Sequence, residues 1–240
     1  EPTHGSRATL ASGKAVYEAA NQTISEMCKR VAKKWQIDPD AVYWDNGYAK
    51  PAGPNAGDFN PISIKQIASE MDQTGGPIAG HHEASIRGVG HSFGVHIADV
   101  EVDPDTGKIT VLRYLVAQDA GRAIHPSYVE GQFQGGAVQG IGWALNEEYV
   151  YGADGCLQNA AFLDYRIPVA SDLPNIDTVI VEVPNPDHPF GVRGVGETGI
   201  APPLPALANA VAAATNVRLR SLPMSPAKVL KAIKTGSDGC

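Results

Sequence analysis

Residues 95–116 read VHIADVEVDPDTGKITVLRYLV and contain two apolar runs that alternate with polar residues. The alternation in the first run slips by one position at Ala98 and Asp99, which predicts a β-bulge. The segment 103–107, DPDTG, separates the runs, with proline at a position of fixed φ and glycine at a left-handed position. Residues 109–116 then return as a partner strand. The sequence therefore predicts an antiparallel hairpin.

Helical and strand patterns are mixed on both sides of this hairpin. Apolar periodicity predicts a helix over 14–35. Capping residues and composition predict further helices over 63–71, 127–145, 206–215 and 225–233, and short strands are expected over 42–44, 149–151 and 178–183. Because regular βαβ alternation is absent, we expect the α+β class, with two-layer sandwich subdomains of mixed and antiparallel strands and packed helices. A seam near residues 80–92 predicts an α+β subdomain over 1–90. A second, over 91–240, would carry a glutamine-rich helix and a glycine-rich loop.

Composition and charge narrow the function classes. The 240 residues have a net charge of −7, which disfavours a nucleic-acid-binding surface. The three cysteines are far apart and form no CxxC, so this chain alone cannot build a zinc ribbon or an iron–sulfur cluster. No apolar run reaches the roughly 18 residues of a membrane span, and no signal peptide is visible. We expect a cytoplasmic protein, with the periplasm left open.

The glycine-rich loop 194–199, GVGETG, presents one carboxylate, Glu197. It matches GxGxxG literally, but prolines precede and follow it, and no acid lies about 20 residues downstream, so dinucleotide binding is disfavoured. The apolar neighbours Val195 and Ile200 would desolvate Glu197 and favour its action as a general base. A solvated glutamate on a surface loop is the alternative.

Two further segments carry polar groups among small residues. Residues 131–140, GQFQGGAVQG, place three glutamines on a predicted helix, where their amides could donate to oxo or carbonyl oxygens. Residues 5–9, GSRAT, place hydroxyls and an arginine ahead of the first helix, which is typical of a phosphate site. A tightly packed helix and a simple capping loop are the alternatives. The histidines show no ligand spacing, so no protein metal site is predicted.

Taken in order, these segments resemble the molybdenum hydroxylases, the xanthine dehydrogenase and aldehyde oxidase family. The resemblance is to the second half of the molybdopterin-binding domain of the large subunit and covers nearly the whole chain. It is carried by residues 5–9 before 13–16, by 98–103 with 106–107, by 119–121 with 125–126, by 131–142, and by 194–197.

The resemblance implies a cofactor and a role for each polar segment. Molybdenum would be held by molybdopterin, often extended to the cytosine dinucleotide, without a protein ligand. Glu197 would be the general base, and Gln132 would hydrogen-bond the oxygens of the metal. The residues implied to hold the cofactor are Gly5, Ser6, Arg7, Ala8, Thr9, Gln132, Val195 and Gly196.

The resemblance also implies partners, because the first half of the molybdenum domain is missing here. Iron–sulfur clusters and FAD would lie only on partner chains or domains. The implied function is the catalytic portion of a hydroxylase that oxidises an aldehyde or N-heterocycle with water as the oxygen source. A reductive or carbon-monoxide-oxidising relative, a non-catalytic cofactor-binding or assembly module, and a fragment that binds nothing are the alternatives.

Overall fold

The computed structural model describes residues 4–85 and 90–236, which belong to two compact units. The smaller unit is Ala11–Arg87. The larger unit combines Gly88–Cys240 with Glu1–Leu10. The division predicted from sequence, 1–90 and 91–240, differs mainly in these first ten residues. Their placement brings the segment GSRAT into the larger unit.

The smaller unit is one long helix packed against a small sheet. Helix α1 (Gly13–Trp35) matches the predicted helix closely, because its apolar residues keep a 3.6-residue period. Strands β1 (Val42–Asp45), β2 (Tyr48–Pro51) and β3 (Ile62–Ser63) pair antiparallel in that order. The core between helix and sheet consists of Met27, Cys28, Val31, Ala32, Val42, Ala49, Ile62 and Ile67.

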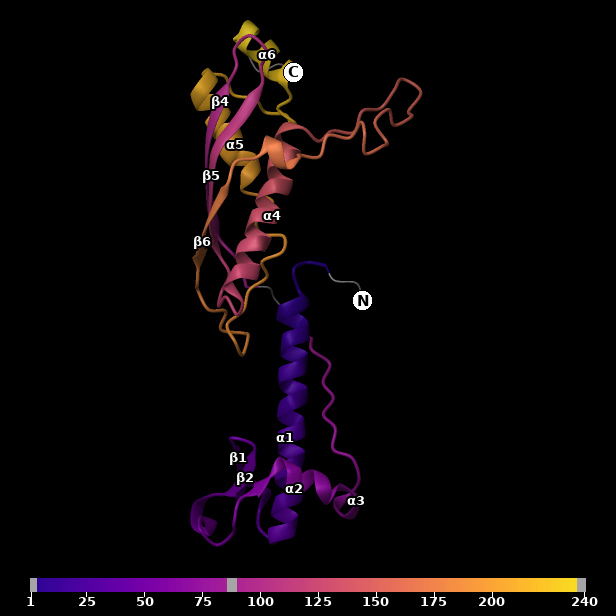
Figure 1. The fold of residues 1–240 in the computed structure, drawn as a ribbon, viewed down its shortest axis with the longest axis vertical. Coiled ribbons are helices and arrows are strands. Elements are labelled where there is room, and N and C mark those ends of the chain that lie inside the picture. Colours follow the sequence, from indigo (N-terminus) through magenta and orange to yellow (C-terminus); the bar gives the residue numbers. More distant parts are fainter. Residues whose placement is uncertain (1–3, 86–89, 237–240) are drawn as a thin grey trace. The chain divides into compact units, whose positions relative to one another are not determined.

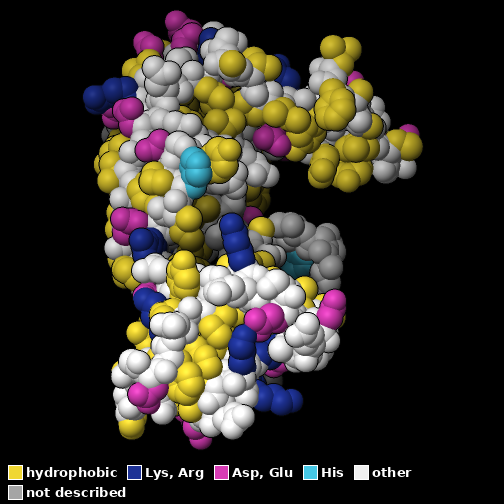
Figure 2. Space-filling view, turned by 60° about the horizontal axis from the view of Figure 1, so that its bottom comes forward, with side chains coloured by type: hydrophobic (Ala, Val, Ile, Leu, Met, Phe, Trp, Pro, Cys, Tyr) yellow, Lys and Arg dark blue, Asp and Glu magenta, His cyan; other side chains and the backbone are white. Residues whose placement is uncertain are grey.

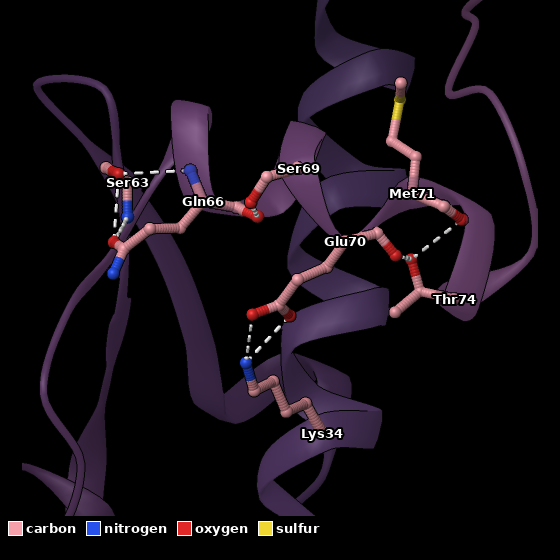
Figure 3. A network of polar contacts seen from close by, with 7 residues as sticks. All are labelled: Lys34, Ser63, Gln66, Ser69, Glu70, Met71 and Thr74. Atoms are coloured by element: carbon pink, nitrogen blue, oxygen red, sulfur yellow. Dashed lines mark hydrogen bonds and ion pairs between the residues drawn. The ribbon is translucent and has the colours of Figure 1, made fainter.

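Two short helices follow the small sheet, α2 (Ile64–Ser69) and α3 (Met71–Thr74), and polar contacts fix them (Figure 3). Ser63 and Gln66 form a capping box, in which the Ser63 Oγ accepts the Gln66 N–H and the Gln66 Oε1 accepts the Ser63 N–H. Lys34 of α1 donates to both carboxylate oxygens of Glu70 at 2.7 Å. The predicted start of this helix at Ser63 is therefore confirmed.

The larger unit is a three-stranded sheet with helices on one face (Figure 1). Strands β4 (Gly94–Val102) and β5 (Ile109–Asp119) form the predicted antiparallel hairpin, and its register shifts between Asp99 and Val100, which confirms the bulge. Strand β6 (Ile176–Val181) pairs with β5 in parallel. Helices α4 (Pro126–Leu145) and α5 (Pro203–Thr215) pack on the sheet, and α6 (Pro226–Thr235) follows them.

The buried face of the sheet includes one polar pair. His96 is buried, and its Nδ1 lies 3.0 Å from the hydroxyl of Tyr114. Burial lowers the pKa of His96 to about 4, so the ring is neutral at physiological pH. Val95 and Ile97 are exposed on the opposite face. The predicted alternation along this strand is therefore correct.

Two features of the larger unit differ from the sequence predictions. The order β5–α4–β6 is a parallel crossover, which local periodicity does not reveal. The strand predicted over 149–151 is wrong, because only Tyr151 pairs, in an isolated bridge to Leu157. Residues 147–172 instead form a projection, here called the arm, that extends from the larger unit (Figure 1). Across the described ranges, no helix combines the length and apolarity needed to cross a bilayer.

Glycines on α4 let the chain after Glu197 pack directly against the helix. A Cβ built on Gly140 would lie 2.5 Å from the carbonyl oxygen of Ile200, and one on Gly136 would lie 3.1 Å from Gly199. A Cβ on Gly135, one position before Gly136, would meet nothing within 4 Å. The glycine pattern therefore marks one face of α4 on which side chains are excluded.

We predict that Gly140→Ala destabilises the protein by about 1–3 kcal/mol, because the new methyl group overlaps backbone atoms. Gly135→Ala is the matched control and should stabilise the same helix by about 0.5–1 kcal/mol, since alanine has the higher helix propensity. Denaturant unfolding of both variants measures the difference. Equal effects of the two substitutions would contradict the packing role of Gly140.

Candidate cofactor site

A cavity of about 740 Å³ opens on the larger unit. Its walls come from three stretches that are far apart in sequence, within residues 4–9, 120–132 and 192–197. These stretches include the segment GSRAT, the start of the glutamine-rich helix and the glycine-rich loop. The fold therefore brings together the three polar segments that the sequence singled out. The volume lies within the range of small-molecule and cofactor pockets.

Ser6 connects the first of these walls to Glu197. Its Oγ accepts the backbone N–H of Glu197 at 2.8 Å and donates to the Glu197 Oε2 at 3.1 Å. Ser6 has φ of 56°, a left-handed conformation that is uncommon outside glycine. A Cβ on Gly194 would lie 2.8 Å from the Ser6 Cβ. Ser6 can therefore approach the loop closely only because residue 194 is glycine.

Gln132 converges on the same corner of the cavity from α4. A Cβ built on Gly196 would lie 3.3 Å from the Gln132 Oε1 and 3.4 Å from the Ser6 Oγ. Gly196 therefore lies between the amide and the hydroxyl, and a side chain there would be tight against both. Ser6, Gln132 and Glu197 thus line one corner of one cavity.

A buried ion pair adjoins the cavity, because its arginine, Arg193, is one of the lining residues. The Nε of Arg193 is 3.0 Å from the Oδ2 of Asp119, and the two side chains are only 11% and 5% exposed. The Asp119 Oδ1 accepts the N–H groups of Gly121 and Val183. Arg193 also donates to the carbonyl oxygen of His91 at 2.7 Å. The end of β5, the stretch around His91 and the segment entering the glycine-rich loop are therefore tied together.

Comparison with known proteins decides the family. A family model of the molybdopterin cofactor-binding domain matches residues 1–174. The chain is a molybdopterin-binding domain of the molybdenum hydroxylase family. Glu197 lies beyond the matched residues, so its role remains a prediction at this point.

Similar proteins of this family are much longer than the chain. It is 34% identical over 236 residues to the 6-hydroxypseudooxynicotine dehydrogenase complex subunit gamma of Paenarthrobacter nicotinovorans, covering 93% of the chain and 29% of that protein. It is 37% identical over 159 residues to the aldehyde oxidoreductase of Megalodesulfovibrio gigas, covering 64% and 17%. The crystal structure of quinoline 2-oxidoreductase from Pseudomonas putida 86 superposes with a TM-score of 0.82 at 25% identity, covering 97% and 30%. The chain thus spans less than a third of these relatives.

The cavity of this molybdopterin-binding domain has donors that fit the cofactor. Hydroxyl groups of Ser6, Thr9 and Ser127, the amide of Gln132 and the guanidinium of Arg122 line it, and such donors suit the phosphate and carbonyl oxygens of a pterin. Within residues 4–85 and 90–236, no three His, Cys, Asp or Glu side chains group closely enough to hold a metal ion.

The structure places most of the predicted site residues on the cavity wall. Those that line it are Gly5, Ser6, Ala8, Thr9, Gln132, Val195, Gly196 and Glu197. Arg7 is half-buried and is not a lining residue. Glu197 and Gln132 are exposed, so this chain does not desolvate the Glu197 carboxylate as its apolar neighbours predicted. The expected desolvation by Val195 and Ile200 is therefore wrong for the chain by itself.

Sequence reasoning missed a second polar group of the cavity, at the start of α4. The rings of His125 and Tyr128 stack with centroids 4.0 Å apart, and the Ser127 hydroxyl lies 3.1 Å from the His125 Nδ1. Arg122 is exposed on the same wall. The sequence signal for this group was the cluster of Arg122, His125 and Ser127 around the start of the predicted helix, because the N-terminus of a helix attracts anions.

We predict that Asp119→Ala destabilises the protein by about 3–5 kcal/mol, because it leaves the Arg193 charge buried without its partner. The control is Asp99→Ala, which removes the exposed partner of Arg113 and should cost less than about 1 kcal/mol. Denaturant unfolding measures both. A loss below about 1 kcal/mol for Asp119→Ala would contradict the anchoring role of the ion pair.

Proposed function

We propose that this chain is the catalytic portion of a molybdenum-dependent oxidoreductase that oxidises an aldehyde or an N-heterocycle, with water as the oxygen source. The observation that carries the proposal is the carboxylate of Glu197, hydrogen-bonded to Ser6 on the wall of a cavity that Gln132 also lines. The names of the relatives support the substrate classes, since one is an aldehyde oxidoreductase and another acts on quinoline, an N-heterocycle.

Some residues of this chain would hold the cofactor, and others would move a proton. When bound, molybdopterin supplies the molybdenum centre for the two-electron oxidation. Ser6, Ala8 and Thr9 would hold the cofactor together with Val195 and Gly196 of the glycine-rich loop, against which Ser6 packs. Arg122 would neutralise the cofactor phosphate, as a guanidinium suits phosphate geometry.

Glu197 would act as the general base toward the attacking water. Its Oε2 accepts the Ser6 hydroxyl, so we assign the transferred proton to Oε1. Because the backbone N–H of the same residue is also bound by Ser6, the carboxylate has a defined position before substrate enters. The amide N–H of Gln132 would donate to oxygen atoms in the cavity and stabilise negative charge that develops there.

The desolvation that a base needs would come from outside this chain. Glu197 is exposed here, and the chain spans only 29% of its relative from Paenarthrobacter nicotinovorans. The remaining half of the molybdenum domain would close over the cavity. That relative is named as a subunit of a complex, which supports the presence of partner subunits. The iron–sulfur clusters and the flavin would lie on such partners. A cytoplasmic location remains a prediction from the sequence.

We predict that Glu197→Gln in the assembled enzyme lowers kcat at least about 10²–10⁴-fold, the usual contribution of a general base, with molybdenum content near normal. Steady-state kinetics and elemental analysis measure the two quantities. Glu130→Gln, an exposed carboxylate of α4 outside the cavity lining, is the matched control and should leave both unchanged. Loss of molybdenum from Glu197→Gln would instead make Glu197 a structural residue.

We predict that Ser6→Ala and Ser6→Gly each lower kcat per bound molybdenum about tenfold, because each removes the hydroxyl that positions Glu197. Comparing the two variants separates the effect of losing the hydroxyl from the effect of backbone strain at residue 6. Glycine tolerates the left-handed conformation at residue 6, so Ser6→Gly should melt at a higher temperature than Ser6→Ala. If Ser6→Gly kept full turnover, the hydroxyl would have no positioning role. Ser69→Ala, in the smaller unit, is the control for loss of an unrelated serine hydroxyl.

A further inference from the structure

The arm presents large apolar side chains to solvent. Phe162 and Leu163 are 94% and 90% exposed, and no other large apolar side chain of the described residues is exposed as much. Further exposed apolar side chains of the arm are Tyr149, Val150, Tyr151, Ile167 and Val169. Contiguous apolar surface of this kind is uncommon on proteins that act alone and marks an interaction site.

The arm has a defined shape although it has no core of its own. Asn159 connects its two branches, accepting the Val150 N–H and donating to the carbonyl oxygen of Glu148. The Gln158 N–H donates to the Val150 carbonyl oxygen at 2.7 Å. The base of the arm is fixed by Lys228, which pairs with Glu148 at 2.9 Å. Backbone and side-chain bonds thus hold the apolar side chains outward before any partner is present.

The charge of the arm indicates what kind of partner it fits. Asp154 is the only charged residue between positions 149 and 163, and Arg166 is the only cation of the arm. The other charged residues of the arm flank this stretch and are Glu147, Glu148, Asp164 and Asp172. In the space-filling view the arm, at the upper right, is mostly hydrophobic, with acidic groups at its margins (Figure 2). Aromatic residues with few charges are typical of the centre of a protein interface, whereas segments that lie on membranes are rich in Lys and Arg.

The length of the relatives indicates which protein surface could contact the arm. The chain corresponds to 29% of the subunit gamma relative, so the larger part of a subunit of that kind lies outside the residues described here. A surface on the same polypeptide has a high effective concentration, which favours a permanent apolar contact over a transient one.

We propose that the arm docks into an apolar groove on the remainder of the same large subunit, with Phe162 and Leu163 as its central anchors. Docking of the arm concerns assembly and does not require Glu197 to be the base, so it can be tested without measuring turnover.

Photo-crosslinking of the assembled enzyme tests the proposal directly. Benzoylphenylalanine replaces Phe162 in the full-length large subunit, and mass spectrometry locates the adducts after irradiation. The expected result is crosslinks to residues of the same subunit outside the stretch that corresponds to this chain. Crosslinks to a second copy, to another subunit or to lipid would overturn the proposal, as would a yield no higher than from the same label at Asp105 in the exposed β4–β5 turn.

Substitution of the anchors provides a second, independent test. The double variant Phe162→Ser with Leu163→Ser should lower the yield of assembled complex at least fivefold in size-exclusion chromatography. The matched control is Ala160→Ser with Ala161→Ser, which changes two exposed neighbours in the same arm without removing large apolar surface, and should assemble normally. Normal assembly of both double variants would overturn the proposal.

Discussion

The candidate site depends on the buried ion pair between Asp119 and Arg193. Its two side chains are almost fully enclosed, so the pair is stable only because hydrogen bonds satisfy its remaining polar atoms. Those bonds reach the end of β5, the segment that follows β6 and the stretch around His91. Arg193 directly precedes the glycine-rich loop. The ion pair that neutralises the Arg193 charge in the interior therefore also fixes the position from which Gly194 to Glu197 extend.

Glycine spacing then fixes the rest of the loop. Gly194 lets Ser6 approach from one side, and Gly136 and Gly140 let the residues after Glu197 rest on α4 from the other. The carboxylate is consequently placed by backbone contacts on both sides and by one hydroxyl group. Placement of this kind supports a chemical role, because a base that is already oriented avoids the cost of ordering during the reaction.

Much of this architecture could be predicted from the sequence, because it depends on residues that are close together along the chain. Apolar periodicity predicted α1, and the phase slip at Ala98 and Asp99 predicted the bulge. Other features depend on distant contacts and left no local signal, namely the parallel pairing of β6 and the place of residues 4–10 in the larger unit. The strand over 149–151 was wrongly predicted because a short run of aromatic and β-branched residues resembles a strand even where it is exposed. The exposure of Glu197 was missed because apolar neighbours in the sequence, Val195 and Ile200, do not have to cover the carboxylate in space.

We infer that the three convergent segments enclose one molybdenum cofactor beside Glu197. Anomalous scattering at the molybdenum absorption edge, measured from crystals of the assembled enzyme, tests it most directly because it locates the metal without assumptions about the protein. The expected result is an anomalous peak inside the cavity that Ser6, Gln132 and Glu197 line. A peak outside that cavity, with the Glu197 carboxylate facing bulk solvent, would contradict it.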